Sequence, residues 1–173
     1  MAKRRKPGKI TGSGPVDVGS NPTGAITKSV VVYTSVHHGN TKRIAEAIAE
    51  ALGAKLVKAD EAEPSSILKF DLIGFGSGIY MFNYHRSVFD LIEKLPKVKK
   101  KAFVFSTSGS GKIQGNLKER LEEKGFEVIG EFHCKGWDTV GPLKLIGGIN
   151  KGKPDERDLE RAREFARSLK RKV

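Results

Sequence analysis

The stretch that decides the fold is Val30-Val31-Val32-Tyr33-Thr34-Ser35-Val36-His37-His38-Gly39-Asn40-Thr41. Its first four residues are β-branched or aromatic, and such a run is typical of a strand buried on both faces of a parallel sheet. From Thr41 onward, apolar residues recur at helical spacing until Gly53 ends the pattern: Ile44, Ala47, Ile48, Ala51 and Leu52. The stretch therefore predicts a strand, a short polar loop and a helix.

The same alternation continues to the end of the chain. Further strands are predicted at 55–57, 70–75, 102–105 and 126–134, with a turn at Pro64-Ser65-Ser66. Three more helices are predicted from apolar stripes: Tyr84, Val88, Phe89, Ile92 and Leu95; then Leu117 and Leu121; then Leu159, Ala162, Phe165, Ala166 and Leu169. Five strands that alternate with helices predict one doubly wound α/β domain with right-handed crossovers.

Residues 1–28 differ from the rest of the chain. They are rich in Gly, Pro, Ser and Thr and show neither helical nor strand periodicity, so we expect a disordered basic tail before a domain over residues 29–173. Two interpretations of this tail stay open. It is either a genuine basic tail or the product of a mis-assigned gene start, because Gly19-Ser20-Asn21-Pro22 is what the T-arm of a transfer-RNA gene would encode.

Composition and charge limit the function classes. The chain has 173 residues with 38% apolar and 30% charged residues, which is typical of a globular domain, and its apolar runs are too short to span a bilayer. The absence of a signal-peptide pattern and the single cysteine, Cys134, favour a cytoplasmic location. The net charge of +12 includes +5 from residues 1–29. This charge favours acidic partners but does not by itself indicate a nucleic-acid-binding protein.

The chemistry of such a domain is expected in the loops that follow the strands. In open α/β sheets, ligands bind outside the carboxyl ends of the strands, where the strand order reverses. Four loops qualify, and all are rich in Gly, Ser, Thr or aromatic residues: 34–41, 76–82, 106–113 and 135–150. A phosphate-binding P-loop is excluded in the third of them, since Ile113 stands where Ser or Thr is required.

The first loop, with Ser35 followed by Gly39-Asn40-Thr41, resembles the phosphate-binding signature of the flavodoxin family. The resemblance implies a flavodoxin-like sandwich, with a five-stranded parallel sheet of order 2-1-3-4-5 and helices on both faces. It implies that FMN is the cofactor and that Ser35, Gly39, Asn40 and Thr41 bind its phosphate. This loop is one residue longer than the family's pattern, and His37 and His38 occupy its middle. These histidines either donate to the phosphate, approach the flavin edge or are partly solvated loop residues.

By position, the second and third loops resemble the two flavin-contact loops of that family. Gly76, Ser77, Gly78, Ile79, Tyr80 and Phe82 are expected beside the flavin ring, with Tyr80 or Phe82 stacked on it. Tyr84 is expected to begin the next helix and to pack inward. The small residues Ser106, Thr107, Ser108 and Gly109 are expected to let backbone N–H groups reach the ring.

The fourth loop contains Trp137, which lies on the side of the sheet expected to hold the cofactor. Trp137 either shields the flavin or fixes its own loop against the last helix. Cys134 is expected to be buried rather than catalytic. We assign no catalytic residue and no metal ligand, because neither a Ser-His-Asp arrangement nor a Cys/His/Asp cluster is visible in these loops.

The resemblance covers about residues 29–170 and implies an FMN-binding electron-transfer protein or a small flavin oxidoreductase. Whether the protein is an enzyme, for example one linked to a quinone or nicotinamide, stays open. The expected partner is a redox protein or a small-molecule electron donor or acceptor, with the chain a monomer or homodimer. The alternative is a non-catalytic flavodoxin-like domain that binds a protein or a polyanion through its basic surface.

Overall fold

The computed structural model describes residues 27–112 and 115–173. The predicted tail, except for Thr27 and Lys28, lies outside the described residues. Five parallel strands form one sheet in the order β2-β1-β3-β5-β6, which confirms the predicted topology. These strands are β1 (Ser29–Thr34), β2 (Lys55–Lys58), β3 (Leu72–Tyr80), β5 (Lys101–Ser108) and β6 (Glu127–Lys135).

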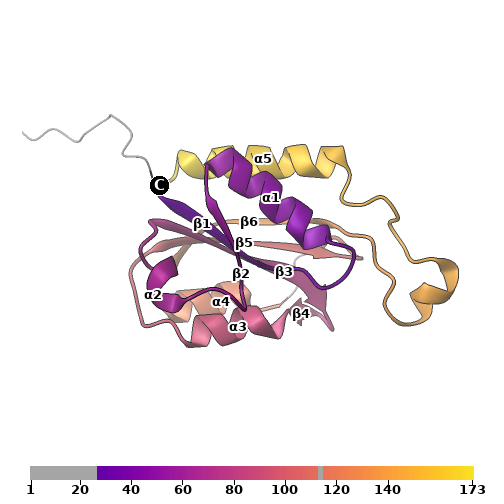
Figure 1. The fold of residues 1–173 in the computed structure, drawn as a ribbon, viewed down its shortest axis with the longest axis horizontal. Helices are drawn as coiled ribbons and strands as arrows, with labels where there is room; N and C mark the ends of the chain where they lie inside the picture. The colour runs from indigo at the N-terminus through magenta and orange to yellow at the C-terminus, as the bar shows by residue number, and fades with distance from the viewer. Residues whose placement is uncertain (1–26, 113–114) are drawn as a thin grey trace, which may run out of the picture.

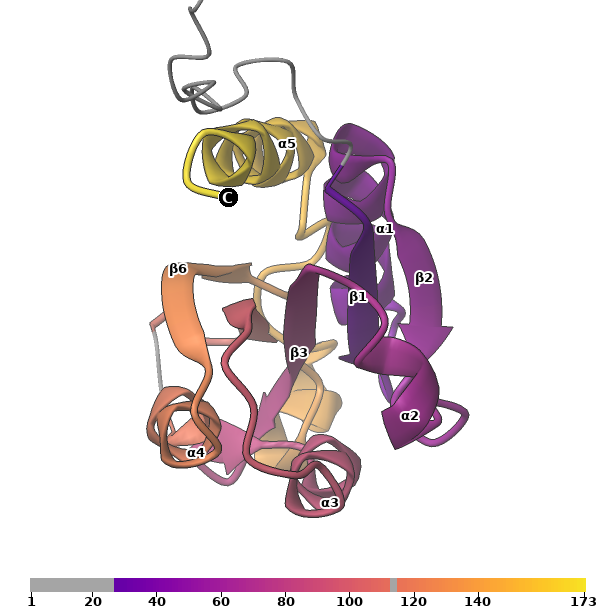
Figure 2. The ribbon, with the colours of Figure 1, turned by 90° about the vertical axis from the view of Figure 1, so that its left-hand side faces the viewer.

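Helices cover both faces of this sheet, as predicted. Helices α1 (Asn40–Leu52) and α5 (Glu156–Lys170) pack on one face, and α2 (Pro64–Ile67), α3 (Arg86–Glu93) and α4 (Leu117–Glu123) lie on the other (Figures 1 and 2). Helix α5 begins with a capping box in which the Asp155 and Asp158 carboxylates accept each other's backbone N–H groups. No helix in the described part of the chain is long and apolar enough to span a membrane.

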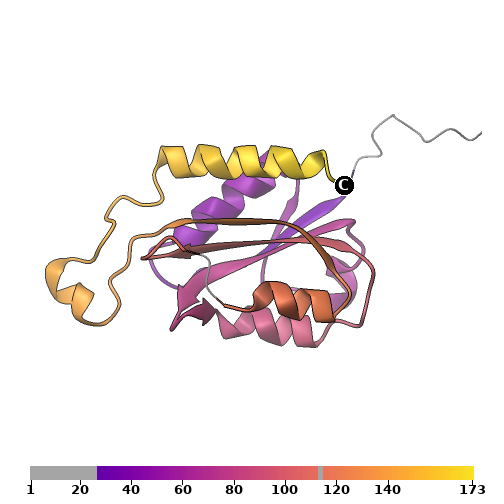
Figure 3. The same ribbon diagram turned by 180° about the vertical axis from the view of Figure 1, so that it is seen from behind.

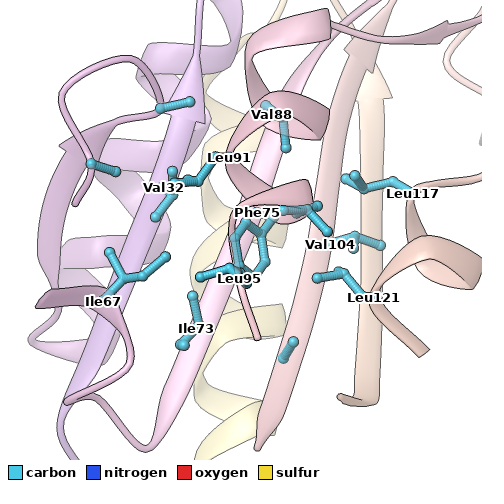
Figure 4. Packing of buried hydrophobic residues seen from close by; sticks show 14 of the residues in the cluster. Val32, Ile67, Ile73, Phe75, Val88, Leu91, Leu95, Val104, Leu117 and Leu121 are labelled. Carbon is cyan, nitrogen blue, oxygen red and sulfur yellow. The ribbon is translucent and has the colours of Figure 1, made fainter. Parts of the chain in front are cut away.

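Two hydrophobic cores hold the three layers together. Alternate residues of each central strand point to opposite faces, so Val32, Phe75 and Val104 pack toward α3 and α4 (Figure 4), whereas Val31, Phe103 and Phe105 pack toward α1 and α5. All six side chains are at most 2% exposed. Burial of each of these side chains stabilises the fold by on the order of 1.5–3 kcal/mol. Because helices cover both faces of the sheet, the central strands are apolar on both faces.

The structure corrects the predicted end of the third strand. Strand β3 continues through Gly76 and Gly78 to Tyr80, because β1 and β5 flank it and pair with it as far as Ser77 and Gly78. The low strand propensity of glycine is overridden by this pairing on both sides. The segment 76–80, predicted as a loop, is therefore strand.

Two other predictions about local structure were wrong. Tyr84 does not begin a helix: it belongs to β4 (Asn83–Tyr84), which pairs antiparallel with the end of β3. Pro64-Ser65-Ser66 begins the one-turn helix α2 rather than a turn. The long connection after β6 contains a 3₁₀ helix, η1 (Gly141–Ile146), within an extension that projects beyond the sheet (Figure 3).

Candidate functional site

A cleft lies at the carboxyl edge of the sheet, next to the point where the strand order reverses, and is lined by the ends of β3 and β5 and by the segments that follow β1 and β6. It has about 390 Å³ of empty space, including its open mouth. Such edges are the usual ligand sites of doubly wound folds. Ten of the residues predicted to form the site line it: His37, Asn40, Thr41, Gly78, Ile79, Tyr80, Thr107, Ser108, Gly109 and Trp137.

The loop between β1 and α1 presents free backbone donors. Gly39 precedes the first turn of α1 in a left-handed conformation (φ +67°), and no side chain caps that turn. The first turn contains no acidic residue. The N–H groups at this end of a 13-residue helix, together with the helix dipole, therefore favour an anion.

Ser35 adds an unpaired hydroxyl to this loop. Its Oγ is buried and has no hydrogen-bond partner among the described residues. Ser35 and Gly39 line a second cavity of about 440 Å³, which shares no lining residue with the cleft. A buried hydroxyl without a partner is costly, and a ligand at this loop would satisfy it.

Hydrogen bonds join the β1–α1 loop to the loops on either side of it. The Thr41 and Thr107 hydroxyls bind each other at 2.8 Å in a buried position, which ties α1 to the end of β5. Asn40 Nδ2 donates to the Trp137 carbonyl at 2.8 Å. The side chains of Asn40 and Thr41 thus already have protein partners, and their backbone N–H groups are what remains for an anion.

The two histidines have different surroundings. The His38 ring stacks on Trp137, with centroids 4.0 Å apart and planes 23° apart, and its Nε2 lies 2.8 Å from Thr139 Oγ1. His37 lines the cleft and lies 6.0 Å from the Tyr80 ring. His38 therefore supports the wall of the cleft from behind, while His37 faces its interior.

Trp137 lines the cleft and is hydrogen-bonded within its own loop. Its indole N–H donates to the Gly147 carbonyl at 3.2 Å, across the extension that follows β6. These contacts account for the position of Trp137 without the contact with the last helix that the sequence suggested. Trp137 is thus held in place from two sides, by His38 and by Gly147.

The end of β3 forms the opposite wall. Tyr80 folds back over Gly78, where a Cβ atom would come within 2.8 Å of the Tyr80 hydroxyl. Burial raises the pKa of Tyr80, so the phenol stays protonated near neutral pH. Met81 and Phe82 follow in left-handed conformations and are 95% and 79% exposed, so Phe82 lies at the rim and not in the cleft.

Three other predicted site residues lie within the sheet. Gly76 packs against the Phe105 ring, which a Cβ atom would approach to 2.3 Å. Ser77 is fully buried, and its hydroxyl accepts from the His85 N–H at 2.8 Å and donates to the Gly78 carbonyl at 2.7 Å. Ser106 is 1% exposed and does not line the cleft, and its Oγ has no hydrogen-bond partner among the described residues.

Sequence reasoning missed part of the site in the last loop. Gly136, Asp138, Thr139 and Val140 line the cleft beside Trp137. Asn150 Nδ2 donates to the Gly109 carbonyl at 2.7 Å and so joins this loop to the end of β5. The signal available was the position of Asn150 in a glycine-rich loop after a strand, but nothing in the sequence shows how far such a loop folds back.

Comparison with known proteins agrees with this geometry. A family model described as a flavodoxin domain matches residues 30–136. An uncharacterised protein of Methanocaldococcus jannaschii is 46% identical over 146 residues, which are 82% of this chain and 97% of that protein. A coenzyme F420H₂ oxidase of Methanothermobacter marburgensis is 33% identical over 125 residues, 63% of this chain but only 31% of that longer protein.

Solved structures show the same fold at low sequence identity. A flavodoxin from the domain Archaea has a TM-score of 0.65 at 18% identity and covers 84% of this chain and 97% of its own. Oxidised flavodoxin 2 from Bacillus cereus also has a TM-score of 0.65, at 23% identity, and covers 84% of this chain and 99% of its own. At this level of identity the likeness concerns the fold.

Proposed function

The chain belongs to the flavodoxin domain family, and from this membership we propose that it binds FMN at the carboxyl edge of its sheet and carries electrons through the flavin. The observation that carries the proposal is the cleft at the strand-order reversal, beside the uncapped first turn of α1. An anionic, planar ligand fits both features. When bound, the flavin supplies the redox chemistry, and the protein supplies position and electrostatics.

The phosphate is proposed to lie at the N-terminus of α1. The free N–H groups that follow Gly39 and the unpaired Ser35 hydroxyl are the donors that a phosphate requires. No carboxylate stands in the first turn to repel it. Ser35 and the backbone of residues 39–41 are therefore the proposed phosphate ligands.

The ring system is proposed to lie between Tyr80 and Trp137. Both side chains line the cleft, and aromatic faces are suitable covers for an isoalloxazine. A Cβ atom at Gly78 would meet the Tyr80 hydroxyl at 2.8 Å and one at Gly109 would meet Asp138 Oδ2 at 2.7 Å, so the cleft walls pack closely against glycine at both positions. Of the two stacking candidates from the sequence, Tyr80 is preferred to Phe82 because Phe82 is 79% exposed at the rim.

Within this family function, we favour an electron carrier over a reductase that stacks a second substrate on the flavin. The volume enclosed between the walls of the cleft is about 40 Å³, far below the roughly 300–1,000 Å³ of typical small-molecule pockets. The walls would therefore have to move apart to admit the ring, and the cleft offers no additional room for a second substrate stacked on it. The redox partner would then be reached through the exposed rim rather than inside the cleft.

The first test is the absorbance spectrum of the full chain, recorded before and after FMN is added and free flavin is removed by gel filtration. We expect flavin bands at about one equivalent and quenched flavin fluorescence. A protein that retains no flavin at neutral pH under reducing conditions would overturn the proposal. A colourless protein whose affinity for a polyanion falls steeply with salt would support the alternative of a non-catalytic basic domain.

A pair of variants locates the site. Gly109→Val places methyl groups against Asp138 and Ile149 in the cleft wall, so FMN affinity should fall at least about tenfold. Ser110→Val adds similar bulk at the next position, which is exposed and does not line the cleft, and should leave the affinity within about twofold. Equal losses in both variants would contradict the placement.

A further inference from the structure

Exposed apolar side chains gather at one edge of the molecule. Seven of the eight large hydrophobic residues exposed in the described part of the chain lie around the cleft: Val36, Met81, Phe82, Val140, Leu145, Ile146 and Ile149. Leu145 and Ile146 are 89% and 73% exposed. A cluster of apolar residues at one edge, unlike scattered single residues, marks an interaction surface.

The centre of this surface is the extension after β6, here called the arm and defined as residues 138–149. An antiparallel bridge between Asp138 and Ile149 closes its base, with both N···O distances at 2.8–3.0 Å. Beyond the base, η1 projects from the body of the protein, as Figures 1 and 3 show. The 3₁₀ helix buries none of its own residues, so its shape is not explained by packing within this chain.

Four lysines lie on the arm or beside it. Lys144 lies on η1, Lys135 and Lys151 flank the base, and Lys112 lies in the neighbouring loop. None of the four forms an ion pair among residues 27–112 and 115–173. The one carboxylate of the arm, Asp138, accepts from the Val140 N–H at 2.9 Å and is half-buried.

We propose that the arm and the rim of the cleft dock an acidic protein that exchanges electrons with the flavin. The apolar tip of η1 would enter a hydrophobic depression on that protein, and the four lysines would face its carboxylates. The inference deepens the proposed function and rests on it, since it names the class of redox partner. An aromatic or aliphatic centre with a charged rim is the usual composition of such interfaces.

Charge argues against a second copy of this chain as the occupant. Each copy has a net charge of +12, and the surface in question carries four lysines that form no ion pair with any described residue. Pairing two such surfaces would bring like charges together and is disfavoured. An acidic partner gains from the same charges, most strongly at low ionic strength.

The test measures binding to a probe of the stated chemistry. An acidic plant-type ferredoxin is titrated into the full chain by calorimetry at low salt, with Lys144→Glu/Lys151→Glu and Leu145→Ser/Ile146→Ser as the arm variants. Each double variant is expected to weaken binding about tenfold. Matched controls at the opposite edge of the sheet, Lys97→Glu/Lys99→Glu and Val173→Ser, should change it less than about twofold, because these residues are exposed far from the arm.

Several outcomes would overturn the inference. These are the absence of binding, equal weakening by arm and control variants, and a dimer in sedimentation that Leu145→Ser/Ile146→Ser dissociates. FMN affinity is measured on the same proteins and should be unchanged in the arm variants. If the unmodified chain binds no FMN, the proposed function fails, whereas normal FMN binding with no effect of the arm means that the docking surface alone fails.

Discussion

At the scale of single residues, Cys134 shows how burial controls reactivity. It is the only cysteine in the chain, it is 3% exposed, and burial raises the pKa of its thiol to about 12. Its position at the end of a predicted strand indicated burial, and the structure confirms this. The reactivity of the Cys134 thiol therefore reports whether the protein is folded.

We predict that native Cys134 reacts with iodoacetamide at pH 8 at least about 100-fold more slowly than the same thiol in urea, because the thiolate is scarcely populated in the folded protein. The raised pKa also has a stability consequence. The unfolded thiol ionises near pH 9 while the folded thiol stays neutral, so stability falls as pH rises from about 9 to 12. Equal labelling rates, or a Cys134→Ala variant with an unchanged alkaline profile, would contradict this.

A second prediction at this scale concerns Tyr80 and the affinity for FMN. Tyr80→Ala removes the aromatic cover and should weaken FMN binding roughly twofold to tenfold, since aromatic pairs contribute about 0.5–1.5 kcal/mol beyond burial. Tyr80→Phe keeps the ring and should bind within about twofold of the original affinity. Fluorescence titration of the apoprotein measures both constants. An affinity in Tyr80→Phe as low as in Tyr80→Ala would assign the effect to the hydroxyl instead of the ring.

At the scale of elements, the end of β3 is the part of the sheet that the sequence pattern predicts wrongly. The run Gly76-Ser77-Gly78 predicts a loop from the sequence alone, because glycine often marks turns and loops. In the structure the same glycines are sites of close packing between strands and aromatic rings, with Phe103 over Gly74 and Phe105 over Gly76. That role depends on the residue in the neighbouring strand, which local patterns do not include.

This packing predicts that Gly76→Ala destabilises the protein by about 1–3 kcal/mol in urea unfolding. The new Cβ would stand 2.3 Å from the ring of Phe105, which is fully buried, so the ring or the strand would have to shift. Phe105→Leu should also destabilise the protein by itself, but it removes the clash. The double variant Gly76→Ala/Phe105→Leu should therefore be more stable than the sum of the single effects implies, and strict additivity would refute the explanation.

At the scale of the whole molecule, the parts predicted from the sequence are those set by periodicity. The order of the five strands, the helices on both faces and the convergence of the loops at one edge follow from alternation and from the handedness of crossovers. The arm and the contacts of Asn150 could not be predicted, because they depend on how residues 138–149 fold back upon themselves. The family's signature predicted the polar loop before α1. Because this loop has one residue more than the signature, the sequence did not show which of its side chains face the cleft.

The two cores share one sheet, and this predicts that the domain unfolds as one unit. Ile48 belongs to the core under α1 and α5, and Leu121 belongs to the core under α4, and both are fully buried. Ile48→Ala and Leu121→Ala should each cost about 2–5 kcal/mol, which for a domain of this size lowers Tm by roughly 4–20 °C. Because alternate residues of the same strands form both cores, loss of either core removes support for the other. Each variant should therefore show a single calorimetric transition, with equal shifts when far-UV and near-UV circular dichroism are followed. Two separated transitions in either variant would mean that the layers on the two faces of the sheet are held together less tightly than their shared strands imply.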